Sequence, residues 1–188
     1  MKLIHFNNFF IFLLLSFEIS QIQAKSIKLS KPEVVLTGWN ARCLTHADLN
    51  GDGLKDLVYF NLDKSYLEIL YRLEAGALPK NVRPLQKNRW EPILEDAKYQ
   101  VERIFITGSI TDIAVGDLNA DGLPDIITAS PQDGVRIYFS ENNASWSDPL
   151  EIESETIRSF SKSLCVIDAN GRNDLYLFTE PGLERISF

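Results

Sequence analysis

Two short acidic segments contain the residues of this sequence that are best suited to chemistry. Residues 48–56 read Asp-Leu-Asn-Gly-Asp-Gly-Leu-Lys-Asp, and residues 117–125 read Asp-Leu-Asn-Ala-Asp-Gly-Leu-Pro-Asp. Both carry oxygen-bearing side chains at positions 1, 3, 5 and 9, with Gly at position 6 and Leu at positions 2 and 7. These segments offer only hard oxygen ligands, which are the ligands that calcium prefers.

The spacing predicts one calcium site in each segment. When such a segment coils tightly, the side chains at positions 1, 3 and 5 turn toward a common centre, and Gly at position 6 permits the sharp bend. Residue 7 offers its main-chain carbonyl, and Asp at position 9 closes the site. Three carboxylates in each segment repel one another unless a divalent cation compensates their charge. The predicted ligands are Asp48, Asn50, Asp52, Leu54 and Asp56 in the first segment, and Asp117, Asn119, Asp121, Leu123 and Asp125 in the second, with each Leu acting through its carbonyl.

Other interpretations of these segments fit less well. An EF-hand begins with the same spacing but needs a bidentate Glu at position 12. Position 12 is Tyr59 in the first segment and Thr128 in the second, and the flanking residues are typical of strands rather than helices. A dockerin loop fails for the same reason. The remaining alternative is a pair of Asx turns without metal, because Asp and Asn favour turns; four oxygen-bearing residues repeated in register favour calcium.

A third, altered copy of the segment begins at Asp168 and reads Asp-Ala-Asn-Gly-Arg-Asn-Asp. It is shorter than the other two and carries Arg172 where the third ligand should be, so we expect no calcium there and two ions in the whole chain. Two interpretations of Arg172 stay open. Its guanidinium bridges Asp168 and Asp174 in place of the metal, or it points to solvent and Asx hydrogen bonds hold the turn.

The rest of the chain predicts an all-β fold that holds these segments between strands. Apolar residues come in short runs, many of them alternating with polar residues, and Asn, Asp, Gly and Pro separate the runs. Val, Ile, Tyr and Phe are frequent in the runs, which is typical of strands. The expected strands include residues 57–60, 66–71, 101–106, 113–115, 126–128, 135–139 and 175–178.

The order of strand, acidic segment and strand repeats about every 60 residues and resembles a known family. The segments at 48–56 and 117–125 look like the loops of FG-GAP/VCBS repeats, which build the β-propellers of integrin α-subunits and of many secreted bacterial proteins. The resemblance covers about residues 31–188. It implies that each repeat is one propeller blade with calcium in the loop between two of its strands. The Phe-Gly and Gly-Ala-Pro motifs that give the repeat its name are missing or altered here.

The expected fold is therefore an all-β partial β-propeller of about two to three four-stranded blades with calcium-binding loops. Propellers close with four to eight blades, so this chain is too short to close a ring by itself. Three explanations stay open. The chain is a shortened product that lacks C-terminal blades, which we favour; or other copies of the chain complete the ring by self-association; or the chain survives as a short arc.

The first residues are predicted to form a secretory signal peptide. Lys2 precedes an apolar run at 9–15, and a polar stretch and the small residue Ala24 follow, which is the order of such a signal. The apolar part is shorter than the roughly 20 residues that span a bilayer, which disfavours a membrane anchor. We therefore divide the chain into a signal peptide (1–24) and a repeat region (25–188). We expect no membrane span after cleavage and a secreted, periplasmic or cell-surface location.

Charge and the remaining motifs favour a binding module over an enzyme. A net charge of −7 argues against a nucleic-acid partner. His46 is not accompanied by a Gly-x-Ser-x-Gly elbow, and the best-placed carboxylates are assigned to calcium, so no catalytic set is readable. We expect a non-catalytic, calcium-binding module for interaction with, or scaffolding of, an extracellular protein or polysaccharide. The alternative is a propeller fragment of a secreted polysaccharide-degrading or redox enzyme.

The Cys and Trp residues are expected to be structural. Cys43 and Cys165 precede the first and third segments at different offsets, which favours two buried free thiols over a disulfide. The three Trp residues are expected to pack in the core or between blades rather than to form a ligand-binding platform. They are Trp39, Trp90 and Trp146.

Overall fold

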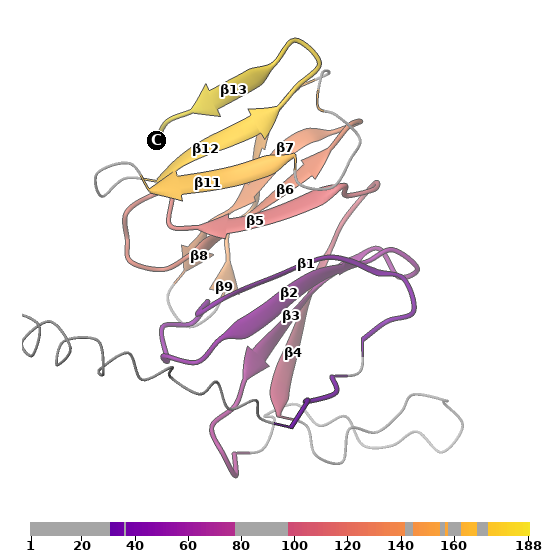
Figure 1. Ribbon diagram of the computed structural model, residues 1–188, viewed down its shortest axis with the longest axis vertical. Coiled ribbons are helices and arrows are strands. Elements are labelled where there is room, and N and C mark those ends of the chain that lie inside the picture. Colours follow the sequence, from indigo (N-terminus) through magenta and orange to yellow (C-terminus); the bar gives the residue numbers. More distant parts are fainter. Residues whose placement is uncertain are drawn as a thin grey trace, which may run out of the picture. The chain divides into compact units, whose positions relative to one another are not determined.

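The structure is a computed structural model, and it describes residues 31–35, 37–77, 98–141, 145–154, 157, 163–168 and 173–188. The chain divides into two units, Met1–Leu36 and Thr37–Phe188. All regular elements of the described residues are β-strands, and they lie in the second unit (Figure 1). The predicted signal peptide, Trp90 and Arg172 lie outside the described residues.

The first sheet is a four-stranded antiparallel meander that follows the order of the chain. It pairs each strand with the next, and one irregularity in the register falls between Arg42 and Thr45. Its strands are β1 (Ala41–Ala47), β2 (Asp56–Asn61), β3 (Tyr66–Arg72) and β4 (Tyr99–Phe105).

The second sheet is also four-stranded, in the order β10-β7-β6-β5. A small hairpin of β8 and β9 lies between β7 and β10 in the chain. The strands of the sheet are β5 (Asp112–Gly116), β6 (Asp125–Ser130), β7 (Gly134–Tyr138) and β10 (Leu150–Ile152). The hairpin consists of β8 (Ser140–Glu141) and β9 (Ser145–Trp146).

The third sheet has three described strands in chain order. They are β11 (Leu164–Asp168), β12 (Asn173–Phe178) and β13 (Leu183–Ile186). An isolated antiparallel bridge pairs Ile157, which precedes this sheet in the chain, with Thr179, which follows β12.

Two apolar clusters join the three sheets face to face. One cluster joins side chains of the first sheet, such as Phe60 and Ile69, to Ile126 of the second sheet. The other joins Ile127 of the second sheet to side chains of the third, such as Leu175. Because successive side chains of a strand point to opposite faces, neighbouring residues of β6 enter different clusters. The second sheet is therefore covered on both faces, and β6 is buried along its whole length.

These observations confirm the all-β prediction and the expectation of two to three blade-like sheets. The predicted strands coincide with β2 to β7 and β12, and the sheets do not close into a ring within the described residues. Two sheets have four strands, whereas the third has three, so the four-stranded blade holds for the first two. The described residues contain no helix long and apolar enough to cross a membrane.

The Trp and Cys expectations are confirmed only in part. Trp146 packs against the first cluster, and its Nε1 donates a hydrogen bond to the hydroxyl of Tyr71 at 3.2 Å. Trp39 is fully exposed, so the packing expectation is wrong for this residue, which precedes the first strand. Cys43 and Cys165 are both free thiols, as expected; Cys43 is half-buried, but Cys165 is exposed rather than buried.

Candidate functional site

The two complete acidic segments occupy the same place in the first two sheets. Residues 48–56, called the first acidic loop from here on, join β1 to β2, and residues 117–125, the second acidic loop, join β5 to β6. The Asp at position 9 of each loop is also the first residue of the second strand. The structure therefore places all ten predicted ligands in two equivalent strand-to-strand loops.

In the first acidic loop, the side chains at positions 1, 3 and 5 turn inward onto the loop's own backbone. The carboxylate of Asp48 accepts hydrogen bonds from the N–H groups of Asp52 at 3.1 Å and Gly53 at 2.8 Å. Asn50 Oδ1 accepts from the N–H of Asp52 at 3.0 Å. Asp52 Oδ1 accepts from the N–H of Leu54 at 2.8 Å. The oxygens at these positions therefore face the inside of the coil, as the spacing predicts.

The second acidic loop repeats this pattern bond for bond. The carboxylate of Asp117 accepts from the N–H groups of Asp121 at 3.1 Å and Gly122 at 2.8 Å. Asn119 Oδ1 accepts from the N–H of Asp121 at 3.1 Å, and Asp121 Oδ1 accepts from the N–H of Leu123 at 2.8 Å. The shared motif is thus sufficient to build the same local geometry twice.

The glycine at position 6 is required by the backbone conformation and not by space. Gly53 and Gly122 have φ values of 84° and 91°, a region that residues with a side chain rarely adopt. A Cβ at either position would meet nothing within 4 Å. The predicted role of this glycine in the sharp bend is therefore confirmed.

The Asp at position 9 has a structural role that the sequence did not indicate. Asp56 is fully buried, and its two oxygens accept from the N–H groups of Leu49 at 2.9 Å and Arg72 at 2.7 Å. Asp125 is equally buried and accepts from Leu118 at 2.8 Å and Ser140 at 3.0 Å. The carboxylate of Asp56 therefore ties the start of its loop to the end of β3. The carboxylate of Asp125 ties the start of its loop to β8, which begins directly beyond β7.

The electrostatics of both loops favour a cation. Burial raises the pKa of Asp56 and Asp125; the two backbone N–H donors lower it, and the charges at positions 1 and 5 raise it further. Within the described residues, the ion pairs involve other acidic residues, and no Lys or Arg pairs with a carboxylate of either loop. Among the described residues, no basic side chain thus balances the negative charge of either loop.

The predicted donors of each loop are oxygen atoms, the kind of ligand that calcium takes. In the described part of the chain, no three His, Cys, Asp or Glu side chains gather into a group that could hold a metal by themselves. The predicted ligand sets differ from such a group, because each also includes an Asn amide and a main-chain carbonyl. Five oxygen donors per loop approach the six to eight ligands of calcium, with water completing the shell. Calcium remains a prediction for both loops.

The third acidic segment is held by contacts that sequence reasoning missed. Asp174 is buried in β12, and its Oδ2 lies 2.6 Å from Nη2 of Arg185 in β13. A basic residue therefore does balance this carboxylate, but it comes from the next strand. Whether Arg172 also bridges Asp168 and Asp174 stays a prediction, since Arg172 lies outside the described residues.

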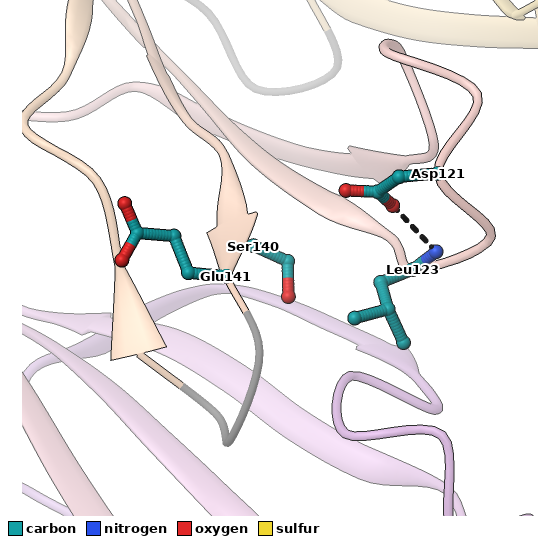
Figure 2. Close-up of a pocket in the computed structure, with 4 residues that line it drawn as sticks. All are labelled: Asp121, Leu123, Ser140 and Glu141. Atoms are coloured by element: carbon teal, nitrogen blue, oxygen red, sulfur yellow. Dashed lines mark hydrogen bonds between the residues drawn. The ribbon is translucent and has the colours of Figure 1, made fainter.

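A cavity of about 430 Å³ adjoins the second acidic loop (Figure 2). Two of its lining residues, Asp121 and Leu123, belong to the predicted ligand set. The other two, Ser140 and Glu141, form β8 and were missed, because a two-residue strand carries no periodic signal.

The fold and the two loops define an all-β protein built from repeats, in which acidic loops join the first two strands of successive sheets. Residues 106–179 match the model of the FG-GAP-like repeat family. This segment contains the second acidic loop and strands β5 to β12. The last strand of the third sheet, β13, lies outside it. The chain therefore carries an FG-GAP-like repeat at these residues, which confirms the FG-GAP part of the resemblance. No curated protein and no solved structure matches the chain.

Proposed function

We propose that this protein is a secreted, calcium-stabilised repeat module without catalytic activity, which binds an extracellular protein or glycan. The observation that carries the proposal is the paired geometry of the acidic loops. Both turn their oxygens at positions 1, 3 and 5 inward, and neither has a basic partner among the described residues.

Calcium would be held in each loop by the side chains at positions 1, 3, 5 and 9 and by the carbonyl at position 7. Backbone N–H groups of the loops already hold the side chains at positions 1, 3 and 5 in place. When bound, the ion would neutralise like charges that the folded chain otherwise keeps close together. Calcium is thus expected to stabilise the loops and the strands that they join.

The absence of catalytic activity is supported by how the acidic residues are used. The carboxylates of the two loops accept backbone hydrogen bonds and form the predicted ligand sets. Two Glu residues of the first sheet, buried Glu68 in β3 and half-buried Glu102 in β4, accept hydrogen bonds from Tyr59 and Tyr71. The FG-GAP-like repeat is a structural module, so an interaction role fits it better than an enzymatic one.

Secretion is supported by the order of charged, apolar and small residues at 1–24. Expression of the full chain in a secreting host, followed by N-terminal sequencing of the exported product, tests this part. A mature protein that begins near Lys25 is expected. A product that keeps residues 1–24 would contradict it.

The experiment that tests the calcium site is a count of bound ions. Isothermal titration of chelator-treated protein should give two calcium ions per chain, and Asp52→Asn and Asp121→Asn should each remove one. A stoichiometry of zero would contradict the proposal, and three would show that the third segment also binds. Asp133→Asn, outside both loops, is the matched control and should leave two ions.

A further inference from the structure

The two acidic loops differ at position 4, directly after the Asn at position 3. The first loop has the pair Asn50-Gly51, and the second has the pair Asn119-Ala120. An Asn side chain can be attacked by the backbone nitrogen of the residue that follows it, which expels the side-chain amide as ammonia. Gly has no Cβ to block this approach and reaches conformations that other residues rarely adopt, so the reaction is fastest at Asn-Gly pairs. The first loop therefore carries a reactive pair that the second loop lacks.

The folded loop polarises the side-chain amide of Asn50. Its Oδ1 accepts a hydrogen bond from the N–H of Asp52 at 3.0 Å, and its Nδ2 donates one to Oδ2 of Asp52 at 2.9 Å. Negative charge develops on Oδ1 when a nucleophile adds to the amide carbon, so a donor that already points at this oxygen stabilises the transition state. The structure thus supplies an activated carbon for the attack.

The backbone nitrogen of Gly51 is the nucleophile of this attack. Gly51 is exposed, and its N–H donates no hydrogen bond within the described part of the chain. Water or hydroxide can therefore reach the proton on this nitrogen, and the loss of that proton leaves the nitrogen free to attack. The nitrogen and the amide carbon belong to neighbouring residues, so the reaction is intramolecular and needs no enzyme.

We propose that Asn50 is a site of spontaneous deamidation, which modifies the first acidic loop and spares the second. The nitrogen of Gly51 bonds to Cγ of Asn50, the bond from Cγ to Nδ2 breaks, and Nδ2 leaves as ammonia with a proton from solvent. One water molecule then opens the resulting succinimide ring. Opening at Cγ gives Asp, and opening at the main-chain carbonyl gives isoaspartate. The net reaction takes up one water and releases one ammonia.

The product changes the first predicted calcium site. Conversion of Asn50 to Asp adds a fourth carboxylate to those of Asp48, Asp52 and Asp56. Conversion to isoaspartate instead adds one methylene group to the backbone of the loop, between the residues whose side chains turn inward. The reaction itself does not depend on calcium. Its consequence for the ion rests on the proposed function, because the two loops of an aged protein would no longer be equivalent sites.

The second acidic loop is a matched control within the same chain. Asn119 makes the same two hydrogen bonds with Asp121, at 3.1 and 2.9 Å, and Ala120 has a φ of 60°, close to the 74° of Gly51. What distinguishes the two pairs is thus the Cβ of Ala120. Asn119 is exposed and Asn50 is half-buried, so exposure alone would make Asn119 the faster site. The proposal predicts the opposite order.

The test compares the two Asn residues in one sample. The full chain is incubated in chelator at mildly alkaline pH, and peptide mass spectrometry measures the replacement of NH₂ by OH at each Asn, with enzymatic methylation to detect isoaspartate. We expect Asn50 to be converted about tenfold faster than Asn119, which corresponds to a barrier lower by about 1.4 kcal/mol. Equal rates, or faster conversion of Asn119, would overturn the proposal. So would an unmodified Asn50 after the time in which a free peptide of residues 46–56 is converted.

Two variants exchange the reactive pair between the loops. Ala120→Gly should raise the rate at Asn119 about tenfold, and Gly51→Ala should lower the rate at Asn50 by a similar factor. A Cβ at position 51 would lie 3.3 Å from Cδ2 of Leu123, so Ala120→Gly is the variant that leaves the packing intact. An unchanged rate at Asn119 in Ala120→Gly would overturn the proposal. Because all rates are measured in chelator, a failure of the calcium proposal would leave this result unaffected.

Discussion

The first and second acidic loops have the same internal hydrogen bonds but different surroundings. Inside the loops, corresponding bonds differ little in length, even though position 4 is Gly51 in one and Ala120 in the other. Outside, the buried Asp at position 9 binds Arg72 in the first repeat and Ser140 in the second. The nine-residue motif therefore determines the shape of the loop, and the neighbouring strand determines what the loop presents to a partner.

The two loops are also held differently by adjacent repeats. Gly51 of the first loop lies against Leu123 of the second, since a Cβ at Gly51 would be 3.3 Å from the Cδ2 of that Leu. The second loop is further held by the third sheet, because Asn173 Nδ2 donates a hydrogen bond to the carbonyl of Asp117 at 2.8 Å. The second loop is thus the more constrained of the two.

The largest expected effect is the loss of the buried Asp at position 9. Asp125→Ala leaves the N–H groups of Leu118 and Ser140 without a partner, and each buried unsatisfied donor costs about 1–3 kcal/mol. We expect Asp56→Ala and Asp125→Ala each to lower the free energy of unfolding by about 3 kcal/mol. Chemical denaturation in chelator measures this without a contribution from calcium.

Asp52→Ala is the control for that experiment, since Asp52 is exposed and lies in the same loop as Asp56. In chelator it should cost about 1 kcal/mol, because the two hydrogen bonds that its carboxylate accepts, from Leu54 N–H and Asn50 Nδ2, are exposed and each contributes little. Equal losses for Asp52→Ala and Asp56→Ala would show that position 9 has no special structural role.

Calcium removal should have the next largest effect. Extracellular calcium modules bind with Kd of about 10⁻⁴–10⁻³ M. At 1 mM calcium and a Kd near 10⁻⁴ M, each site contributes about 1.4 kcal/mol, so two sites contribute about 3 kcal/mol. The thermal midpoint should therefore fall in chelator, and an unchanged midpoint would contradict the proposal.

Single-site variants sharpen the comparison between the loops. Asp52→Asn and Asp121→Asn change the same position of the motif, so each should remove about half of the stabilisation by calcium. Calcium titrations of the thermal midpoint measure both. If only one variant reduces the stabilisation, the two loops are not equivalent calcium sites.

The contact between the third sheet and the second loop should have a smaller effect. Asn173→Ala removes the hydrogen bond to the carbonyl of Asp117, and we expect a loss of about 1 kcal/mol. The loss should lower calcium affinity at the second site alone, because the hydrogen bond of Asn173 goes to the second loop. Calcium titration of Asn173→Ala in the Asp121→Asn background reports on the first site, and in the Asp52→Asn background on the second. An equal drop in affinity at both sites would contradict this.

The sequence predicted the strands and loops because both are encoded locally. Alternating apolar runs determined β2, β3 and β7, and the Asp and Asn spacing determined the inward side chains of both loops. The double role of Asp56 was not predictable in this way. It depends on the N–H of Arg72, which reaches the carboxylate only after β2 and β3 have paired.

The missed features share this dependence on tertiary contacts. Ser140 lines a cavity because β8 begins just beyond β7, and Arg185 balances Asp174 because β13 pairs with β12. Trp39 was expected to be packed because large aromatic residues usually are, but it lies outside the strands and is exposed. Residue type predicted its burial wrongly because no strand carries it into a core.

The smallest expected effect concerns position 4, where the two loops differ in sequence. Gly51 and Ala120 both have positive φ, 74° and 60°, and a side chain in this region costs about 1 kcal/mol. Gly51→Ala should therefore destabilise the protein by about 1 kcal/mol, the more so because its Cβ would crowd Leu123. Ala120→Gly relieves the same strain but gives the unfolded chain more freedom, so the net change should stay under about 0.5 kcal/mol.

Denaturation curves of both variants would measure the difference between these two changes in stability. It follows from one shared conformation occupied by different residues, so it tests whether the loops are alike in the folded protein. If Gly51→Ala proved neutral, the first loop would have to adopt a different backbone at position 4. The equivalence of the two loops would then hold for their side chains but not for their backbone.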